Sequence, residues 1–352
     1  MAKRKPRAID LFSGCGGTSL GIKNAGFRVI AAVENDPLAV ATYRKNLRDV
    51  QVWARDIRRL AVKEVMAYHK LGRGGLDLLA GCPPCQAFSA LPRLNGRRRV
   101  RDKKSKDLVF QYLRFVRKLL PKVVLIENVP RLIKDYRFNQ VRKALRHLGY
   151  VGKPIVLDAA HFGVPQRRRR MVFIASRVGP IQYAAPAAKS KSLTVKDTIG
   201  RLPRPAKSRD ALHKLPEDRC DRVKALIAAI PKNGGSRTAL GVKQQLRCHE
   251  ECDGFNDVYG RMAWGKVAPT ITGGCVNPSK GRFLHPTQNR AMTLREAALL
   301  QTFPLRYWFS LERGKFAAAQ MIGNAFPPIL ARKHAFCIIK RLRAHANEKG
   351  TR

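Results

Sequence analysis

The chain has 352 residues, of which 45% are hydrophobic, and it carries 70 lysine and arginine residues against 24 aspartate and glutamate residues. A chain of this length and composition buries a sizeable core and has room for two domains. Its formal net charge of +46 disfavours an enzyme that acts only on small neutral molecules and indicates a polyanionic partner, most simply a nucleic acid.

The sequence contains no pattern typical of export or membrane insertion. Its N-terminus is basic but continues into a short strand, not into the apolar core of a signal sequence. No apolar run approaches the length of a membrane span. The eight cysteines are scattered over a chain too long to need disulfide bonds for stability, so we expect reduced thiols and a cytoplasmic location.

Strands and helices are predicted to alternate over the first half of the chain. Residues 7–12 and 28–33 read as strands, separated by a glycine-rich turn and a helix that Thr18 is expected to cap. Pro37 opens the next helix. Further strands are expected at 76–80, 123–126, 155–157 and 171–175, and further helices at 105–120 and 140–148. This order predicts an α/β fold with a doubly wound, mainly parallel sheet.

The composition and periodicity of the sequence change near residue 177. Residues 179–285 hold many prolines and glycines and little clean periodicity, which predicts a smaller, irregular, partly β domain. Helical pattern resumes at 293–301, where Thr293 and Glu296 have capping-box spacing, and again at 328–344. We expect domains at 1–178 and 179–305, and a C-terminal segment at 306–352.

Cys85 follows an apolar strand and two prolines that fix the backbone of its loop. The residue is therefore expected on a stiff turn just past the carboxyl end of a strand, where ligands bind in open α/β sheets. A thiol at this position is a candidate nucleophile. A structural cysteine in a tight turn is the alternative.

The glycine-rich turn at 14–17 lies between the first strand and the first helix, and Glu34 ends the next strand. Glycines let a backbone approach a ligand closely, and a carboxylate at this place binds both hydroxyls of a ribose. The pattern predicts a nucleotide site, although a tight structural turn fits it as well. A dinucleotide would require a third glycine where Ser19 stands.

Glu127 also closes a buried strand and should share a sheet edge with Cys85. A carboxyl group near a nucleophilic thiol exchanges a proton with the substrate, whereas a solvated acid at a strand end is the alternative. The four arginines at 167–170 form a candidate anion site or a solvated charge run. Cys220, Cys248, His249 and Cys252 lack a second paired half of a zinc motif, so no metal is expected.

Taken together and in this order, the motifs resemble those of the DNA cytosine-5 methyltransferase family, over nearly the whole chain. The arginine-rich loop after Ser89 and the segment 179–285 depart most from the family pattern. The matching residues are Phe12, Gly14, Gly16 and Gly17; Glu34-Asn35; Asp56-Ile57; Pro83-Pro84-Cys85-Gln86; Glu127-Asn128-Val129; Gln166, Arg168 and Arg170; Arg295-Glu296 with residues 300–304; and Gly323-Asn324-Ala325 with Pro327.

The resemblance implies a Rossmann-like, S-adenosylmethionine-dependent methyltransferase fold in which residues 179–305 form a target recognition domain. It implies a covalent adduct between Cys85 and carbon 6 of a flipped-out cytosine, which is then methylated at carbon 5. Glu127 would hold the ring, Arg170 would contact the cytosine O2, and Arg168 would orient Glu127 and a backbone phosphate. The implied cofactor contacts are Phe12, Gly14, Gly16, Gly17, Glu34, Asn35, Asp56, Ile57, Pro83, Asn324 and Ala325. The implied DNA contacts are Gln86, Ser89, Arg97, Arg98, Arg99 and Gln166.

We expect double-stranded DNA as the partner, a monomer, and a cognate restriction endonuclease in a prokaryotic source. A tRNA cytosine-5 methyltransferase on the same scaffold is the nearest alternative, although that branch has a smaller target domain. A catalytically silent DNA-binding protein is disfavoured by Cys85, Glu127 and Arg170. An NAD-dependent oxidoreductase is disfavoured by Ser19 and by the charge.

Overall fold

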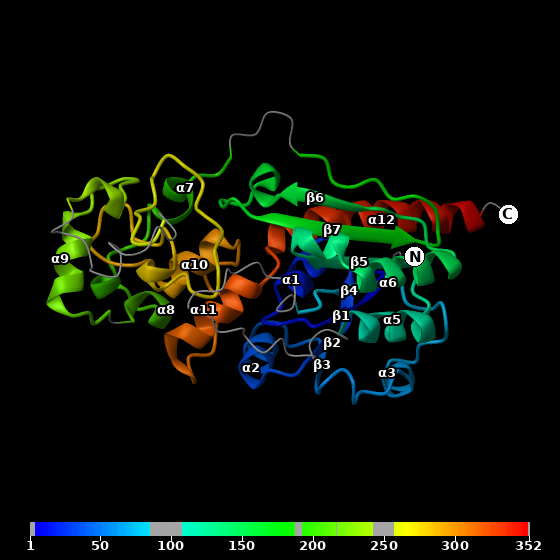
Figure 1. Cartoon of the computed structure of the whole chain (residues 1–352). Helices are drawn as coiled ribbons and strands as arrows, with labels where there is room; N and C mark the ends of the chain where they lie inside the picture. The colour runs from blue at the N-terminus through cyan, green and yellow to red at the C-terminus, as the bar shows by residue number, and fades with distance from the viewer. Residues whose placement is uncertain (1–3, 85–107, 187–191, 216, 242–256, 351–352) are drawn as a thin grey trace. The chain divides into compact units, whose positions relative to one another are not determined.

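The computed structural model describes residues 4–84, 108–186, 192–215, 217–241 and 257–350 (Figure 1). The chain forms two compact units. Unit 1 comprises residues 1–158, 169–186 and 328–352, and unit 2 comprises residues 159–168 and 187–327. This division differs from the expected boundaries at 178 and 305: residues 179–186 belong to the first unit, and residues 159–168 and 306–327 belong to the second.

Unit 1 is built on a seven-stranded sheet with the strand order β3-β2-β1-β4-β5-β7-β6. The first five strands in this order are parallel, and β7 runs antiparallel to both β5 and β6. The doubly wound, mainly parallel sheet is therefore confirmed. The strands are β1 (Arg7–Leu11), β2 (Arg28–Glu34), β3 (Gln51–Ala54), β4 (Leu78–Gly81), β5 (Val123–Asn128), β6 (Pro154–Asp158) and β7 (Arg169–Ser176).

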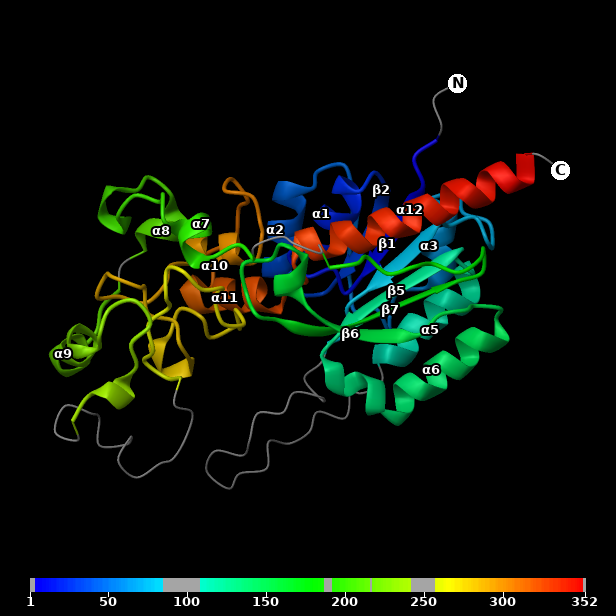
Figure 2. The ribbon, with the colours of Figure 1, turned by 90° about the horizontal axis from the view of Figure 1, so that it is seen from above.

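Helices cover both faces of this sheet. Figure 2 shows α1 and α12 on one face and α5 and α6 on the other. Helix α12 packs so closely on α1 that a Cβ at Gly21 would lie 2.4 Å from the Pro328 carbonyl oxygen. No helix in the described ranges has both the length and the apolar character needed to cross a bilayer. The helices are α1 (Gly17–Asn24), α2 (Pro37–Asn46), α3 (Val62–Tyr68), α5 (Leu108–Leu119), α6 (Tyr136–His147) and α12 (Pro328–Gly350).

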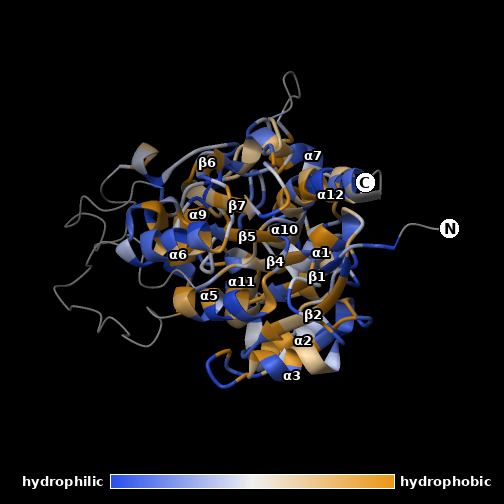
Figure 3. Cartoon of the chain, turned by 90° about the vertical axis from the view of Figure 1, so that its right-hand side faces the viewer, coloured by the Kyte–Doolittle hydropathy of each residue, from blue (hydrophilic) through white to orange (hydrophobic). Residues whose placement is uncertain are grey.

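The apolar pattern of the strands explains the core of unit 1. All residues of β4 and β5 are buried, and α5 turns its apolar stripe, including Tyr112 and Phe115, toward the same core. Figure 3 shows hydrophobic colouring along the central strands and mixed colouring on the surrounding helices. Burial of this surface is the main term that stabilises the sheet.

The N-terminal caps show where several of the predicted helices begin. Pro37 is the first residue of α2, as expected, and Asp36 caps it by accepting a hydrogen bond from Leu38 N. The predicted Thr18 cap is wrong, because Gly16 in the left-handed region is the N-cap of α1. Helix α6 begins four residues earlier than expected, where the Asp135 side chain caps it.

Unit 2 is irregular, as predicted. Its described residues form short helices and isolated β-bridges, such as Arg261 with Leu284. In place of regular secondary structure, the buried guanidinium of Arg261 holds separate segments together. It donates hydrogen bonds to the carbonyl oxygens of Ile227, Ile230, His285 and Gln288. The predicted Thr293 capping box is present in α10. The helices are α7 (Val195–Ile199), α8 (Ala211–Lys214), α9 (Asp221–Ala229), α10 (Leu294–Leu300) and α11 (Gly314–Asn324).

Candidate active site

The predicted site residues of unit 1 that the structure describes follow the ends of strands at one edge of its sheet. Leu11 at the end of β1 is in register with Gly81 at the end of β4, and Gly81 is in register with Ile126 near the end of β5. Asn128 pairs with Met171, so the start of antiparallel β7 lies at the same edge. The loops and side chains that follow these strand ends therefore lie close together, as ligand sites do in open α/β sheets.

The glycine loop after β1 has backbone φ angles that residues with a side chain rarely adopt. Gly14 and Gly16 have φ values of 52° and 92°, and an added Cβ at Gly14 would meet nothing within 4 Å. Phe12 also has a positive φ of 59°, which is uncommon outside glycine. Helix α1 begins at Gly17 without a side-chain cap, so its first N–H groups are suited to a polar ligand.

Glu34 ties this loop to the end of β2. Its Oε2 accepts a hydrogen bond from Gly14 N at 2.8 Å. Its Oε1 accepts from the backbone N–H groups of Asn35 and Asp36 at 2.8 and 2.9 Å. The carboxylate is thus fixed beside the open space over Gly14, where it retains lone pairs for further hydrogen bonds.

The other predicted cofactor contacts near β3 are less distinctive. The Asp56 carboxylate accepts from the guanidinium of Arg58, which lowers the pKa of Asp56. Ile57 packs in the hydrophobic core of unit 1, and Asn35 is exposed. The contacts of these residues with a cofactor stay predictions.

Glu127 and Arg170 form an ion pair at the same edge. The Nε of Arg170 lies 2.9 Å from Oε1 of Glu127, and both side chains are largely buried. Asn128, next in β5, donates from Nδ2 to the carbonyl oxygen of Pro83 at 2.8 Å. This bond fixes the start of the predicted nucleophile loop relative to the strand that carries Glu127.

Two predicted site residues instead hold unit 2 together. Arg168 is only 2% exposed and donates from Nη1 and Nη2 to the carbonyl oxygens of Ile271, Gly323 and Ala325. Its predicted contacts with Glu127 and with a backbone phosphate stay predictions, and the ion pair that the structure gives Glu127 is with Arg170. Gln166 is fully buried and donates to Leu300 O and to Gln301 Oε1, and its DNA contact stays a prediction.

The remaining predicted residues divide into two groups. Asn324 and Ala325 lie at the C-terminal end of α11 in unit 2, where Asn324 is exposed. The predicted nucleophile and most predicted DNA contacts lie outside the described residues; these are Cys85, Gln86, Ser89, Arg97, Arg98 and Arg99. Cys248, His249 and Cys252 are outside them too, and the described ranges hold no group of three or more possible metal ligands.

Sequence reasoning missed a buried polar chain beneath the glycine loop. Tyr43 donates its hydroxyl to Ser19 Oγ at 2.7 Å, and Ser19 donates to Oδ2 of Asp10 at 2.6 Å. Burial raises the pKa of Asp10 to about 7, against the lowering effect of the Ser19 hydrogen bond, and the nearby Glu34 charge raises it further. The only sign of these hydrogen-bonded side chains in the sequence is Asp10, an acidic residue inside an otherwise apolar strand pattern.

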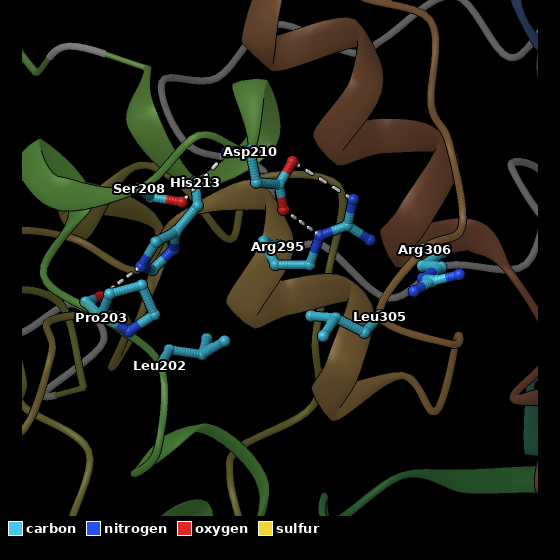
Figure 4. Close-up of a pocket in the computed structure, with 8 residues that line it drawn as sticks. All are labelled: Leu202, Pro203, Ser208, Asp210, His213, Arg295, Leu305 and Arg306. Atoms are coloured by element: carbon cyan, nitrogen blue, oxygen red, sulfur yellow. Dashed lines mark hydrogen bonds and ion pairs between the residues drawn. The ribbon is translucent and has the colours of Figure 1, made fainter.

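A pocket of about 480 Å³ in unit 2 does not add a second candidate site (Figure 4). His213 contacts Thr293 Oγ1 through Nδ1 and Pro203 O through Nε2, both at 2.8 Å. Arg295 pairs with Asp210 in the pocket wall. These buried polar groups bind one another, so few remain to hold a ligand. The lining residues are Leu202, Pro203, Ser208, Asp210, His213, Arg295, Leu305 and Arg306.

Comparison with known proteins shows which family the chain resembles. The family model described as C-5 cytosine-specific DNA methylase matches residues 7–340. The chain is 34% identical to the type II methylase M.HgiDII of Herpetosiphon aurantiacus, over 92% of each chain. It is 33% identical to the type II methyltransferase M1.HphI of Haemophilus parahaemolyticus, over 94% of this chain and 86% of that protein.

Solved structures give the same result for the fold. A protein from E. coli, described as a DNA modification methyltransferase encoded within a prophage, superposes with a TM-score of 0.70 at 26% identity, over 96% of this chain and 100% of that one. The S. pombe Dnmt2 methyltransferase superposes with a TM-score of 0.61 at 19% identity, over 96% and 99%, and supports the fold alone. The chain therefore belongs to the C-5 cytosine-specific DNA methylase family, and it is a DNA cytosine-5-methyltransferase.

Proposed function

We propose that the enzyme uses S-adenosylmethionine to methylate carbon 5 of a cytosine in one specific duplex DNA sequence. The observation that carries this proposal is the Arg170–Glu127 ion pair, at the sheet edge that also carries the glycine loop. An acid fixed at this edge, beside a loop that leads to Cys85, fits nucleophilic attack on a base better than it fits binding alone.

The glycine loop and Glu34 are suited to this cofactor. The open space above Gly14, the uncapped start of α1 and the fixed Glu34 carboxylate would accept its amino-acid and ribose groups. Phe12, Gly16, Gly17, Asn35, Asp56, Ile57, Pro83, Asn324 and Ala325 are the further contacts that we propose. When bound, S-adenosylmethionine would supply the methyl group.

Cys85 would act as the nucleophile. Its thiolate would add to carbon 6 of the cytosine, which makes carbon 5 enamine-like and able to accept a methyl group. Loss of the proton from carbon 5 would then break the bond between sulfur and carbon 6 and restore the ring. Because carbon 6 is not accessible within stacked bases, the target base would have to leave the helix.

Glu127 would bind the cytosine ring during this step. Its carboxyl group would hydrogen-bond to N3 and the exocyclic amino group and stabilise the charge that develops when Cys85 adds. Arg170 holds Glu127 through Nε, and other N–H groups of its guanidinium would contact the cytosine O2. This assignment combines in Arg170 two roles that the sequence had divided between Arg168 and Arg170.

DNA binding would be shared between two parts of the chain. Gln86, Ser89, Arg97, Arg98 and Arg99 would contact the substrate near the reacting base, with the arginines on phosphates. Residues 179–305 would read the target sequence from an irregular, loop-rich surface. We also propose a monomeric, cytoplasmic enzyme with a cognate restriction endonuclease, by analogy with the type II relatives.

Bisulfite sequencing of DNA from a host that expresses the protein tests the proposal directly. We expect 5-methylcytosine at one short sequence throughout the DNA, and its absence when Cys85 is replaced by serine. Methylation found only in tRNA would instead support the RNA-directed alternative, and unmodified nucleic acid in both fractions would contradict both.

A further inference from the structure

We propose that the edge of the unit 1 sheet opposite the candidate active site binds a second segment of duplex DNA. Strands β4 and β5 begin at this edge and β7 ends at it, since Leu78 is in register with Val123 and Val123 with Ser176. Glu127 and Arg170 lie at the other edge, and the six residues of β5 separate the two edges by about 20 Å. The proposal goes beyond cytosine methylation, because it concerns DNA outside the active site. The cations that form this basic edge are Arg73, Arg117, Lys118, Arg146 and Arg177.

Two separate segments of the basic edge are bonded to the C-terminal end of α5. Gly74, which follows Arg73, donates its N–H to the carbonyl oxygen of Leu119 at 2.8 Å. Arg177, which follows β7, donates from Nη1 to the carbonyl oxygen of Leu120 at 3.3 Å. Because the last turn of α5 carries two of the cations, these bonds bring four of the five cations to one place.

The end of α6 joins the same group through Tyr150. The N–H of Tyr150 donates to the carbonyl oxygen of Leu145 at 3.0 Å, next to Arg146 in the last turn of α6. Its hydroxyl donates to the carbonyl oxygen of Pro121, just after α5. The Arg177 guanidinium lies 5.9 Å from the centroid of the Tyr150 ring. The fifth cation therefore belongs to the same edge as the other four.

The negative charge at this edge does not balance its cations. The Asp77 carboxylate already pairs with Arg4 at 3.4 Å and with Lys122 at 2.7 Å. Across the described residues, no ion pair joins a carboxylate to any cation of the basic edge. The C-terminal ends of α5 and α6 carry about half a negative charge each and offset about one of the five cations. About four positive charges therefore remain, on side chains that are all exposed.

Duplex DNA is the polyanion that fits this edge. Four of the five cations are arginines, whose planar guanidinium forms paired hydrogen bonds with a phosphate. The ring of Tyr150 is 3% exposed and cannot stack on an unpaired base, which favours a duplex over a single strand. Because the enzyme acts on DNA, other segments of the bound molecule are present at high effective concentration.

The stiffness of DNA separates this binding from that of the substrate. The persistence length of a duplex is about 150 bp, so a duplex of about 20 bp held at the active-site edge cannot bend back to the opposite edge. A long molecule, or a second short duplex, can reach it. The basic edge would therefore let the enzyme hold two DNA segments at once and pass from one to the other without release.

A bridging measurement tests this proposal. The enzyme is loaded on an immobilised duplex of about 20 bp that contains its target, and capture of a second, fluorescent duplex of the same length is measured at several salt concentrations. Wild type should capture the second duplex with a steep salt dependence. The triple variant Arg117→Gln, Lys118→Gln and Arg146→Gln should weaken capture at least about tenfold and lower the slope of the salt dependence by about three. Its kcat/KM on the short duplex should change less than about twofold.

The matched control removes three exposed cations from α12, which Figure 2 shows on the opposite face of the sheet from α5 and α6. Arg332→Gln, Lys340→Gln and Arg343→Gln together should leave capture within about twofold of wild type. Thermal unfolding verifies that both triple variants are folded. The single variants Arg117→Gln and Arg146→Gln are measured as well, and each should lower the slope by about one.

Three results would overturn the proposal. Undiminished capture by the variants of the basic edge, or an equal loss in the α12 control, would show that capture does not depend on this edge. A parallel fall in kcat/KM on the short duplex would place the edge in the path of the substrate. Stronger capture of duplex RNA or polyglutamate than of duplex DNA would exclude DNA as the occupant. Because capture requires no methyl transfer, a failure of the proposed S-adenosylmethionine chemistry would leave this result unchanged.

Discussion

Arg170 Nε lies 2.9 Å from Glu127 Oε1, and the two side chains are 15% and 7% exposed. They come from neighbouring antiparallel strands, β7 and β5, at the point where β7 begins and β5 ends. A carboxylate that is largely removed from water depends on such a partner, because burial of an uncompensated charge is costly. Arg170 therefore fixes the position of the Glu127 carboxylate and supplies its counter-charge.

Replacement of Arg170 by alanine should lower kcat about a hundredfold, because Glu127 would lose both its counter-charge and its orientation. Initial rates of methyl transfer into duplex DNA measure the effect. Arg169→Ala is the control: its side chain is exposed, and Arg170 Nη1 binds only the backbone oxygen of residue 169. A kcat within a factor of two of wild type for Arg170→Ala would contradict the assigned role.

The nucleophile is tested by trapping. A duplex that carries 5-fluorocytosine at the target has no proton to lose from carbon 5, so the wild-type adduct should persist through denaturing electrophoresis. Cys85→Ser should form no adduct and transfer no methyl group, while its affinities for DNA and cofactor change less than about threefold. An adduct with the serine variant would show that another residue attacks the base.

The sequence predicted most of the strands, the mainly parallel sheet and the position of Glu127 at a strand end, and the reasons are local. The buried strand at 123–128 begins with the continuous apolar run 123–126, and Glu127 stands out because it follows that run directly. The roles of Arg168 and Arg170 could not be separated in the same way. Four adjacent arginines have the same chemistry, and only the tertiary structure surrounds Arg168 with carbonyl oxygens and places Arg170 beside Glu127. The contact of Thr18 Oγ1 with Cys82 Sγ joins residues 64 positions apart, which no local pattern indicates.

Glu34→Ala should weaken the binding of S-adenosylmethionine about tenfold, because the ribose would lose a charged acceptor. Calorimetry measures the affinity, and Glu64→Ala, which removes an exposed acid paired with Arg55, should leave it unchanged. Glu34 also accepts a hydrogen bond from Gly14 N. The loss of the ribose contact must therefore be separated from the loss of this bond to the glycine loop. A cofactor analogue without the ribose hydroxyls should bind wild type and variant equally. Unequal binding of this analogue would show that Glu34 acts only through the loop.

Asp10 should make folding stability depend on pH. Its pKa in the folded protein is raised to about 7, so the folded state holds the proton more tightly than the unfolded chain does. The resulting stabilisation is fully present below the ordinary pKa of 3.8 and is lost as pH rises through about 7. Between about pH 4 and pH 8 this loss is on the order of 4 kcal/mol.

Denaturant unfolding of wild type and Asp10→Asn across this range measures the loss, because asparagine keeps an acceptor for Ser19 without titrating. The variant should gain stability relative to wild type as pH rises. Asp49→Asn is the control of opposite sign: the hydrogen bond from Lys23 lowers the pKa of Asp49, so its smaller contribution is lost as pH falls. Parallel pH profiles for wild type and Asp10→Asn would contradict the raised pKa.

Sequence choice should be transferable with the irregular segment of unit 2, and the contacts of Arg261 decide where the segment must be cut. Its guanidinium donates to carbonyl oxygens from Ile227 to Gln288, so a cut at 285 would divide the group that it organises. A cut after residue 292, just before the Thr293 cap of α10, keeps these bonds within the graft. The graft must also retain Asp210, which pairs with Arg295 outside it.

We therefore expect a chimaera that carries residues 187–292 of a relative with a known target to methylate that relative's sequence, with the chemistry of Cys85 and Glu127 unchanged. The reason is that affinity from phosphate contacts is independent of sequence, whereas contacts with base edges are not. Bisulfite sequencing of DNA modified by the chimaera gives the result. The matched control is a chimaera that receives residues 108–158 of the same relative and should keep the original target. An active 187–292 chimaera that still methylates the original sequence would place target choice in unit 1 and contradict the division of labour proposed for the two units.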